Sequence, residues 1–382
     1  MTPVIESRLP GAQTNIFTVM SRLANEHGAI NLSQGFPDFP VDQELTSRVY
    51  RAMEQGHNQY APMAGVPLLR ERIAHLIAAD YARPTDPESE VTVTAGGTQA
   101  LYIAIAALLR PGDEAIVFDP AFDTYDPAIR LNGGVPVHVP MHPPDFTIPW
   151  DRVEAIISPR TRMIIVNTPH NPCGTVLSEN DIVELERLCV RYGLLVIGDE
   201  VYERMVFDGL RHHSVLSRPA LTDHAVAVFS FGKTFHVTGW KTGYVVAAPR
   251  LMEEIRKIHQ YLVFSVNTPI QVALADFLQD PGHYLHLGEL YQQKRDRFLK
   301  LLERSPFRPL PCSGSYFQLV SYDGYTTESD RDLAVRLTRE KGLASIPVSA
   351  FYQDGTDHHL LRFCFAKRPE TLDAAGVILA GL

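Results

Sequence analysis

The sequence is poor in cysteine and has no long hydrophobic run. Four cysteines occur among 382 residues, namely Cys173, Cys189, Cys312 and Cys364. No two of them form a C-x-x-C pair, so the sequence predicts neither a zinc site nor a redox motif, and we interpret all four as free thiols. No stretch of about 18 apolar residues is present, so no membrane helix is expected. Residues 1–10 lack the features of a signal peptide, which predicts a reducing, cytoplasmic setting.

Positive charge is also in deficit. Lys and Arg together number 35 against 44 Asp and Glu, which gives a formal net charge of −9. Such an acidic chain argues against nucleic acid or an anionic membrane as a partner, so any bound anion must be held by a local positive site. The histidine pairs at 212–213 and 358–359 have diverging side chains, and no H-E-x-x-H spacing occurs, so no metal site is predicted.

What is present is the composition of an ordinary globular protein, with 45% apolar and 21% charged residues. Short apolar runs alternate with longer helical patterns at residues 91–94, 115–118, 163–166, 194–197 and 225–228. These runs are continuous rather than alternating, as in strands that are covered on both faces. Between two of them, Ser178 and Gly193 are suited to begin and end a helix. The order predicts an α/β fold with a mostly parallel central sheet covered by helices.

The last hundred residues have a different character. A charged helix at about 283–304, a strand at 316–320, a helix at about 330–341 and a strand at 360–365 indicate a smaller α+β domain. We therefore expect a large domain over 41–282 and a small domain formed by 1–40 together with 283–382.

Polar residues gather just after the apolar runs, where parallel sheets bind their ligands. They are Thr98, Asn171, Asp199, Tyr202, Ser230 and Lys233. The glycine-rich turn at 94–99 is suited to an anion at a helix N-terminus, although an ordinary turn explains it equally well. It is neither a Walker A loop nor G-x-G-x-x-G, so a nucleotide is not indicated.

Three charged residues in apolar surroundings are candidates for chemistry. Lys233 follows a buried strand, and burial beside Lys241 would lower its pKa as a nucleophile requires; the alternative is an exposed loop lysine. Asp199 ends an apolar run, and a pyridinium nitrogen would offset the cost of burying it, although it could simply cap a turn. Arg362 lies in an apolar strand, where it would capture a substrate carboxylate or form a structural ion pair.

Taken together, these motifs resemble the class I and II aminotransferases, the fold-type-I enzymes that use pyridoxal 5′-phosphate. The resemblance extends from Asn-Leu-Ser-Gln-Gly-Phe-Pro at 31–37 to the strand of Arg362. Ser-Phe-Gly-Lys at 230–233, Thr-Gly-Trp-Lys-Thr-Gly at 238–243 and the segment 261–269 look most like the kynurenine, glutamine and methionine aminotransferase branch.

The resemblance implies a role for each matching residue. Lys233 would bond to the cofactor and move the substrate proton, Asp199 would hold the pyridine nitrogen, and Tyr202 and Asn171 would bond its phenolic oxygen. The remaining expected contacts are Phe122 stacked on the ring, Gly97, Thr98, Gln99, Ser230 and Lys241 at the phosphate, and Arg362 with Gly35 at the substrate carboxylate. Tyr60 would reach the phosphate of a neighbouring subunit, which implies a homodimer.

Two departures from the family pattern stand out. Lys241 occupies a position where the wider family usually has arginine, and His236 replaces a small residue. No second arginine for a side-chain carboxylate is evident, so we expect the amino group of an uncharged amino acid (methionine, glutamine, kynurenine or an aromatic one) to be transferred to a 2-oxo acid. The alternatives are β-elimination from cysteine conjugates or cystathionine, and a non-enzymatic ligand sensor, which the acidic charge and the short segment before residue 33 disfavour.

Overall fold

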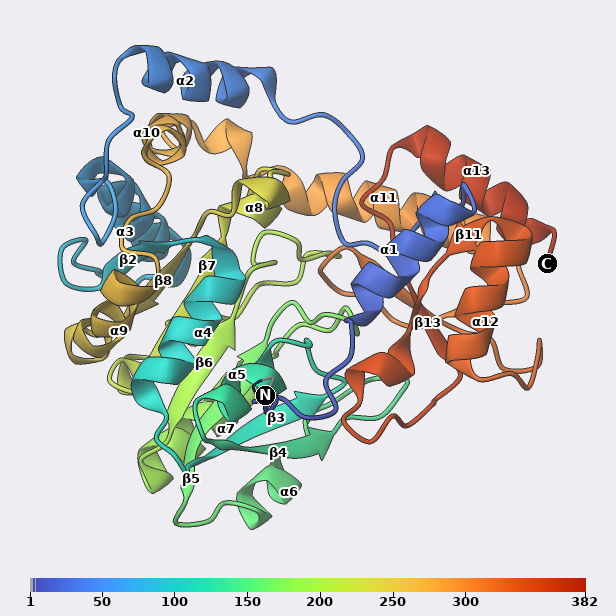
Figure 1. Cartoon of the computed structure of the whole chain (residues 1–382), viewed down its shortest axis with the longest axis horizontal. Helices are drawn as coiled ribbons and strands as arrows, with labels where there is room; N and C mark the ends of the chain where they lie inside the picture. The colour runs from blue at the N-terminus through green and yellow to red at the C-terminus, as the bar shows by residue number, and fades with distance from the viewer. Residues whose placement is uncertain (1–2, 4) are drawn as a thin grey trace.

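The computed structural model describes residues 3 and 5–382, and a seven-stranded sheet forms its centre (Figure 1). The strand order is β2-β8-β7-β6-β5-β3-β4. Strands β3 to β7 pair in parallel, whereas β8 is antiparallel to both β7 and β2. The bounds of these strands are β2 Val91–Thr94, β3 Glu114–Asp119, β4 Val135–Pro140, β5 Thr161–Asn167, β6 Leu195–Asp199, β7 Ala225–Ser230 and β8 Gly243–Ala247. The predicted α/β class with a mostly parallel sheet is confirmed.

Helices cover both faces of this sheet (Figure 1). The longer ones are α1 Ile16–Glu26, α2 Gln43–Glu54, α3 Pro67–Tyr81, α4 Gly96–Leu108, α7 Glu179–Tyr192, α9 Pro249–Leu262, α10 Thr268–Phe277, α11 Leu287–Leu302 and α13 Pro369–Ala380. The shorter ones are α5 Tyr125–Leu131, α6 Trp150–Ala155, α8 Phe231–Thr234 and α12 Asp330–Arg336. None of the helices in residues 3 and 5–382 is long and apolar enough to cross a bilayer.

Strand β6 illustrates why the apolar runs are continuous. Leu195 and Ile197 pack in one buried cluster, while Val196 packs in the cluster on the opposite face. Successive side chains of a strand point to opposite sides, so a strand buried on both sides needs apolar residues throughout. The helix before it begins with Ser178, whose side chain accepts from the main-chain N–H of Asp181, and ends at Gly193 with φ +67°. Its predicted start and end are thus where the sequence places them.

A second group of strands belongs to the C-terminal part of the chain. Four of them form an antiparallel sheet in the order β12-β13-β10-β9, and β1 pairs in parallel with β11. Their bounds are β1 Ile30–Asn31, β9 Arg308–Pro309, β10 Phe317–Ser321, β11 Leu343–Ala344, β12 Ile346–Pro347 and β13 Leu360–Cys364. The N-terminal helix α1 lies against this group (Figure 1). The domain bounds themselves stay a prediction.

A histidine between two carboxylates joins β3, β4 and α5. His138 Nδ1 lies 2.8 Å from Asp119 and its Nε2 lies 3.0 Å from Asp126. Burial alone would lower the pKa of His138, but the two carboxylate hydrogen bonds outweigh it and raise the pKa to about 9. The imidazolium form is therefore part of the folded state at neutral pH.

This cluster predicts a loss of stability in alkaline solution. Because the folded pKa is raised above the unfolded value, its contribution is complete below about pH 6.5 and lost as pH rises through about 9. Denaturant unfolding at pH 7 and pH 9.5 should show a decrease of about 2 kcal/mol that His138→Gln no longer shows. An equal decrease in both proteins would contradict this assignment.

Candidate active site

The predicted site residues come from loops that follow the carboxyl ends of the central strands. Thr98 lies in the first turn of α4, after β2, and Asp199 ends β6. Lys233 lies in α8, directly after β7. A cavity of about 150 Å³ brings them together with Gly97, Phe122, Asn171, Tyr202, Ser230 and Lys241. A wider opening of about 950 Å³ adjoins it and adds Gly35, Gln99 and Arg362.

Lys233 is held at the junction of the two cavities. Its Nζ donates a hydrogen bond to the Tyr316 hydroxyl at 2.9 Å. The same nitrogen lies 5.4 Å from the ring centre of Tyr202 and 5.5 Å from that of Tyr316. Burial lowers the pKa of Lys233 to about 8, and the charge of Lys241 contributes in the same direction. An amine with this pKa is partly neutral at physiological pH, as a nucleophile or a proton acceptor must be.

Asp199 is a buried carboxylate with one oxygen left without a partner. Its side chain is 3% exposed, and its Oδ2 accepts a hydrogen bond from the Tyr125 hydroxyl at 2.6 Å. Its Oδ1 is buried with no hydrogen-bond partner. Burial raises the pKa of Asp199 to about 6, against the opposing hydrogen bond from Tyr125. A cationic N–H donor in the small cavity would satisfy the free oxygen and offset the cost of burial.

Arg362 is a buried cation that forms no salt bridge with a carboxylate among the described residues, although Asp123 lies near enough to stabilise its charge. It donates to Asn171 Oδ1 at 2.6 Å and to the Ser33 carbonyl at 2.8 Å, while its Nε has no partner. The guanidinium lies 3.8 Å from the ring centre of Phe317. Burial lowers its pKa to about 10. A guanidinium held by neutral acceptors at the edge of an open cavity is suited to bind a ligand carboxylate.

The turn before α4 forms one end of the small cavity. A Cβ on Gly97 would lie 2.9 Å from Val201, so only glycine fits there without a shift. The Lys241 Nζ lies 3.5 Å from the position of a Cβ on Gly96. The N-terminus of α4, the Ser230 side chain and the Lys241 ammonium group therefore surround a position suited to an anion.

Gln99 makes two contacts within the chain that its sequence position did not indicate. Its Oε1 accepts from the main-chain N–H of Ala95 at 2.9 Å, and its Nε2 lies 3.2 Å from His259 Nδ1. The side chain thus braces the turn, and Gln99 lines the wider opening rather than the small cavity. A phosphate contact of Gln99 stays a prediction.

Gly35 and Tyr60 occupy contrasting places. Gly35 lines the wider opening, and a Cβ there would lie 2.7 Å from the Phe317 ring. Tyr60 is 83% exposed and lines neither cavity of its own chain, although its ring lies 5.5 Å from that of Phe264. Within one chain, the structure therefore does not bring Tyr60 to the other predicted residues.

Sequence reasoning missed two hydroxyls that touch the site, those of Tyr125 and Tyr316. Tyr125 lies three residues after Phe122, and their ring centres are 5.8 Å apart. This short sequence distance from a predicted site residue was the signal that could have pointed to Tyr125. Tyr316 is far from Lys233 in the sequence, and no local pattern could connect them. His236, noted as a departure, has φ +60° and packs against Phe39 outside both cavities.

The arrangement fits a flat aromatic ligand with a cationic ring nitrogen and an anionic tail. Asp199 Oδ1 would accept from the ring nitrogen, Phe122 lines the same cavity, and the turn before α4 would hold the tail. The Lys233 amine would reach an electrophilic carbon on such a ring. Within residues 3 and 5–382, no group of three or more His, Cys, Asp or Glu side chains is placed to hold a metal ion.

Comparisons with known proteins agree with this chemistry. The family profile "Aminotransferase class I and II" matches residues 27–376. The methionine aminotransferase of Escherichia coli K12 is 51% identical over 371 residues, which cover 97% of this chain and 96% of the relative. Rat kynurenine–oxoglutarate transaminase 3 is 34% identical, over 96% of this chain and 88% of its own length.

A solved structure is equally similar. The crystal structure of YbdL from Escherichia coli, reported with a methionine aminotransferase function, superposes with a TM-score of 0.97 at 50% identity, covering 100% of both chains. With the family profile, the relatives and the site chemistry in agreement, the chain belongs to the class I and II aminotransferases and uses pyridoxal 5′-phosphate.

Proposed function

We propose that this aminotransferase moves the amino group of an uncharged amino acid, of the methionine, glutamine, kynurenine or aromatic type, to a 2-oxo acid. One observation carries the proposal. Among the described residues that line the wider opening, the cations are Lys233, Lys241 and Arg362, and the single anion is Asp123. Two of these cations are needed at the cofactor, so Arg362 is left for one carboxylate. A second carboxylate on the substrate side chain would find no further cation among the residues of this chain that are described as lining the opening.

The names of the relatives favour the same donors. A protein 51% identical to this chain is a methionine aminotransferase, and one 34% identical is a kynurenine–oxoglutarate transaminase. The match to an aminotransferase family over residues 27–376 decides against the non-enzymatic ligand sensor.

We assign the residues of this chain as follows. Asp199 holds the pyridine nitrogen, Asn171 and Tyr202 bond the phenolic oxygen, and Phe122 stacks on the ring. The phosphate contacts are Gly97, Thr98, Gln99, Ser230 and Lys241. When bound, the cofactor supplies an electron sink that makes the hydrogen on the substrate Cα acidic.

The chain then orients the substrate and moves this proton. Arg362 and the main chain of Gly35 hold the α-carboxylate, which fixes the position of Cα relative to Lys233. The Lys233 amine, with its pKa lowered to about 8 by burial, accepts the proton from Cα and would deliver it to C4′ of the bound cofactor.

The test is a donor screen with the purified, cofactor-loaded enzyme. Methionine added without a 2-oxo acid should remove the visible absorption of the bound cofactor within a single turnover, and a 2-oxo acid should restore it. Aspartate serves as the control donor. Equal single-turnover rates for aspartate and methionine would overturn the proposed specificity. Release of ammonia and pyruvate from a cysteine conjugate without any acceptor would favour the β-lyase alternative.

We also propose a homodimer in which Tyr60 reaches the phosphate of the partner chain. Tyr60, Tyr261 and Leu262 are 83%, 88% and 51% exposed, and Leu262 also lines the wider opening. A group of exposed large apolar side chains favours a protein partner. Light scattering should give twice the mass of one chain, and Tyr60→Ala should weaken phosphate binding; a monomer with full affinity would contradict both.

Three further predictions stay proposals. We propose that residues 41–282 form one domain and residues 1–40 with 283–382 the other; the pairing of β1 with β11 supports this grouping. We propose that the protein acts without nucleic acid or a membrane. We also propose a cytoplasmic location, which cell fractionation tests.

A further inference from the structure

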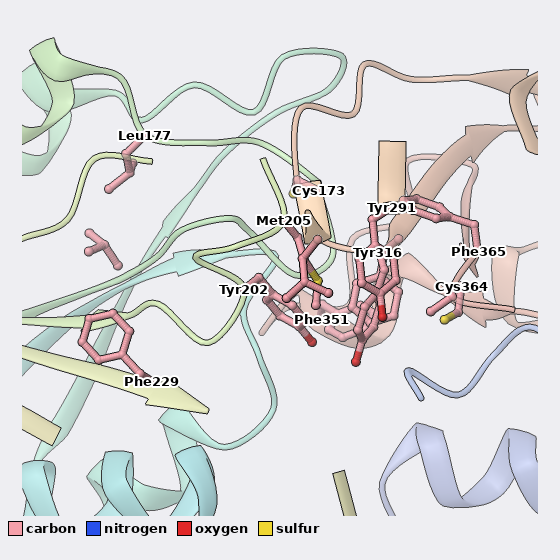
Figure 2. Close-up of a cluster of buried hydrophobic side chains, with 14 of the residues drawn as sticks. Cys173, Leu177, Tyr202, Met205, Phe229, Tyr291, Tyr316, Phe351, Cys364 and Phe365 are labelled. Carbon is pink, nitrogen blue, oxygen red and sulfur yellow. The ribbon is translucent and has the colours of Figure 1, made fainter. Parts of the chain in front are cut away.

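The Tyr316 hydroxyl lies between the amine of Lys233 and the main chain of Gly35. It accepts from Lys233 Nζ at 2.9 Å and donates to the Gly35 carbonyl oxygen at 2.6 Å. The side chain is fully buried, and its ring centre lies 5.1 Å from that of Tyr202. Figure 2 shows Tyr316 beside Tyr202 and Tyr291, within the cluster of buried side chains. Its position is therefore set by packing on several sides.

The directions of these two hydrogen bonds follow from counting protons. A carbonyl oxygen can only accept, so the single proton of the Tyr316 hydroxyl is committed to Gly35. The hydroxyl can then offer only a lone pair to Lys233, and the lysine must donate. Burial raises the pKa of Tyr316 well above its ordinary value, so the hydroxyl keeps its proton throughout the neutral range.

We propose that Tyr316 is a further catalytic residue, which holds the Lys233 amine through one N–H and leaves the nitrogen lone pair free for the reaction. The proposal rests on the proposed function, because that function assigns Lys233 both the covalent bond to the cofactor and the proton transfer. An amine without this contact would rotate among several directions, and misplacement by about 1 Å costs about 10²-fold in rate.

The same hydroxyl connects the amine to the substrate carboxylate site. The Gly35 carbonyl accepts from Tyr316. Phe317, which follows Tyr316 in the sequence, packs on Arg362, with the guanidinium 3.8 Å from its ring centre. A Cβ on Gly35 would lie 2.7 Å from Phe317 and 3.3 Å from Tyr316, so this main chain is held closely against both rings. Tyr316, directly before β10, and Phe317, its first residue, thus position the two cations on which catalysis depends.

The test compares Tyr316→Phe with Tyr291→Phe in the loaded enzyme. The Tyr291 ring centre lies 5.8 Å from that of Tyr316, and the buried Tyr291 hydroxyl has no hydrogen-bond partner. Both variants therefore lose one buried hydroxyl, but only Tyr316→Phe removes the contact with Lys233. We expect Tyr316→Phe to lower the single-turnover rate at saturating methionine by about 10²-fold with little change in KM. Tyr291→Phe should react at the wild-type rate.

A second measurement does not depend on turnover. Pyridoxal phosphate is added to cofactor-free protein, the mixture is quenched with borohydride at intervals, and covalent labelling of Lys233 is followed by mass spectrometry. Labelling should be slower in Tyr316→Phe than in Tyr291→Phe. Thermal melts give the folded fraction of each variant, to which the rates are normalised.

The possible results separate this proposal from the proposed function. If the two variants match in both turnover and labelling, the proposal for Tyr316 is overturned. If the wild type labels at Lys233 but accepts no amino donor, the proposed function fails, and the labelling rates still decide the role of Tyr316. Slow turnover and slow labelling confined to Tyr316→Phe would support the proposal.

Discussion

Lys233→Ala is expected to lower the rate of amino transfer by about 10⁴-fold or more, because the variant loses both the covalent attachment and the proton acceptor. Among the described residues that line the two cavities, the other lysine is Lys241, which lies at the anion end of the small cavity, against Gly96, and is not placed to replace Lys233. The measurement is the single-turnover loss of visible absorption on addition of methionine. The variant should also form no borohydride-stable bond to pyridoxal phosphate.

Two further variants make this result specific. Lys233→Arg keeps a positive charge but cannot act as a nucleophile, so it should be equally inactive. Lys257→Ala removes a surface lysine whose side chain is 52% exposed, and it should react as the wild type does. Turnover by Lys233→Ala at the rate of Lys257→Ala would exclude Lys233 from the reaction.

Asp199→Asn is expected to weaken cofactor binding by about 10²–10⁴-fold, which corresponds to the roughly 3–5 kcal/mol lost when one partner of a buried ion pair is removed. The carboxylate is 3% exposed and its Oδ1 has no partner among residues 3 and 5–382, so its pairing with a cationic ring nitrogen would be strongly favourable. Equilibrium dialysis of pyridoxal phosphate measures the affinity. The residual loaded enzyme should also react slowly, because the ring nitrogen would no longer be kept protonated.

The affinity for the cofactor should also depend on pH through the ionisation of Asp199. Burial raises the pKa of Asp199 to about 6 in the cofactor-free protein. Binding needs the ionised carboxylate, so affinity should fall as pH drops through about 6, and Asp199→Asn should not show this fall.

The neighbouring residue provides a matched control. Glu200 is fully buried on the same strand end, and burial raises its pKa to about 8, so its carboxyl is mostly protonated at pH 7. Glu200→Gln is close in shape to this neutral form and should bind the cofactor as the wild type does at pH 7. If Glu200→Gln lost as much cofactor affinity as Asp199→Asn, the effect would not be specific to Asp199, which would contradict our assignment.

Much of the secondary structure around this site follows from local sequence patterns. The continuous apolar run that ends at Asp199 predicts a buried strand, because both faces of β6 are covered by packed side chains. Ser178 and Gly193 mark the ends of α7, because capping and a left-handed C-terminus depend on nearby residues alone. Antiparallel β8 was not anticipated, since nothing in its own residues distinguishes an antiparallel strand in a buried sheet.

Sequence patterns were less informative about the partners of the site residues. Gln99 is predicted to contact the phosphate, and the sequence did not indicate that its side chain also bonds Ala95 and lies next to His259, 160 residues away. Asn171 was expected at the cofactor, and its oxygen also holds Arg362, 191 residues away. Both contacts depend on where other elements pack.

The sequence by itself therefore determined five strands of the central sheet, the ends of α7 and the polar residues at the carboxyl edge of the sheet, because periodicity and capping act over a few neighbouring residues. Only the tertiary structure decided that Tyr125 supports Asp199 and that Tyr316 joins Lys233 to Gly35, across 74, 83 and 281 residues of sequence. These contacts arise when the packing of whole elements buries polar groups, which must then find hydrogen-bond partners wherever the fold has placed them.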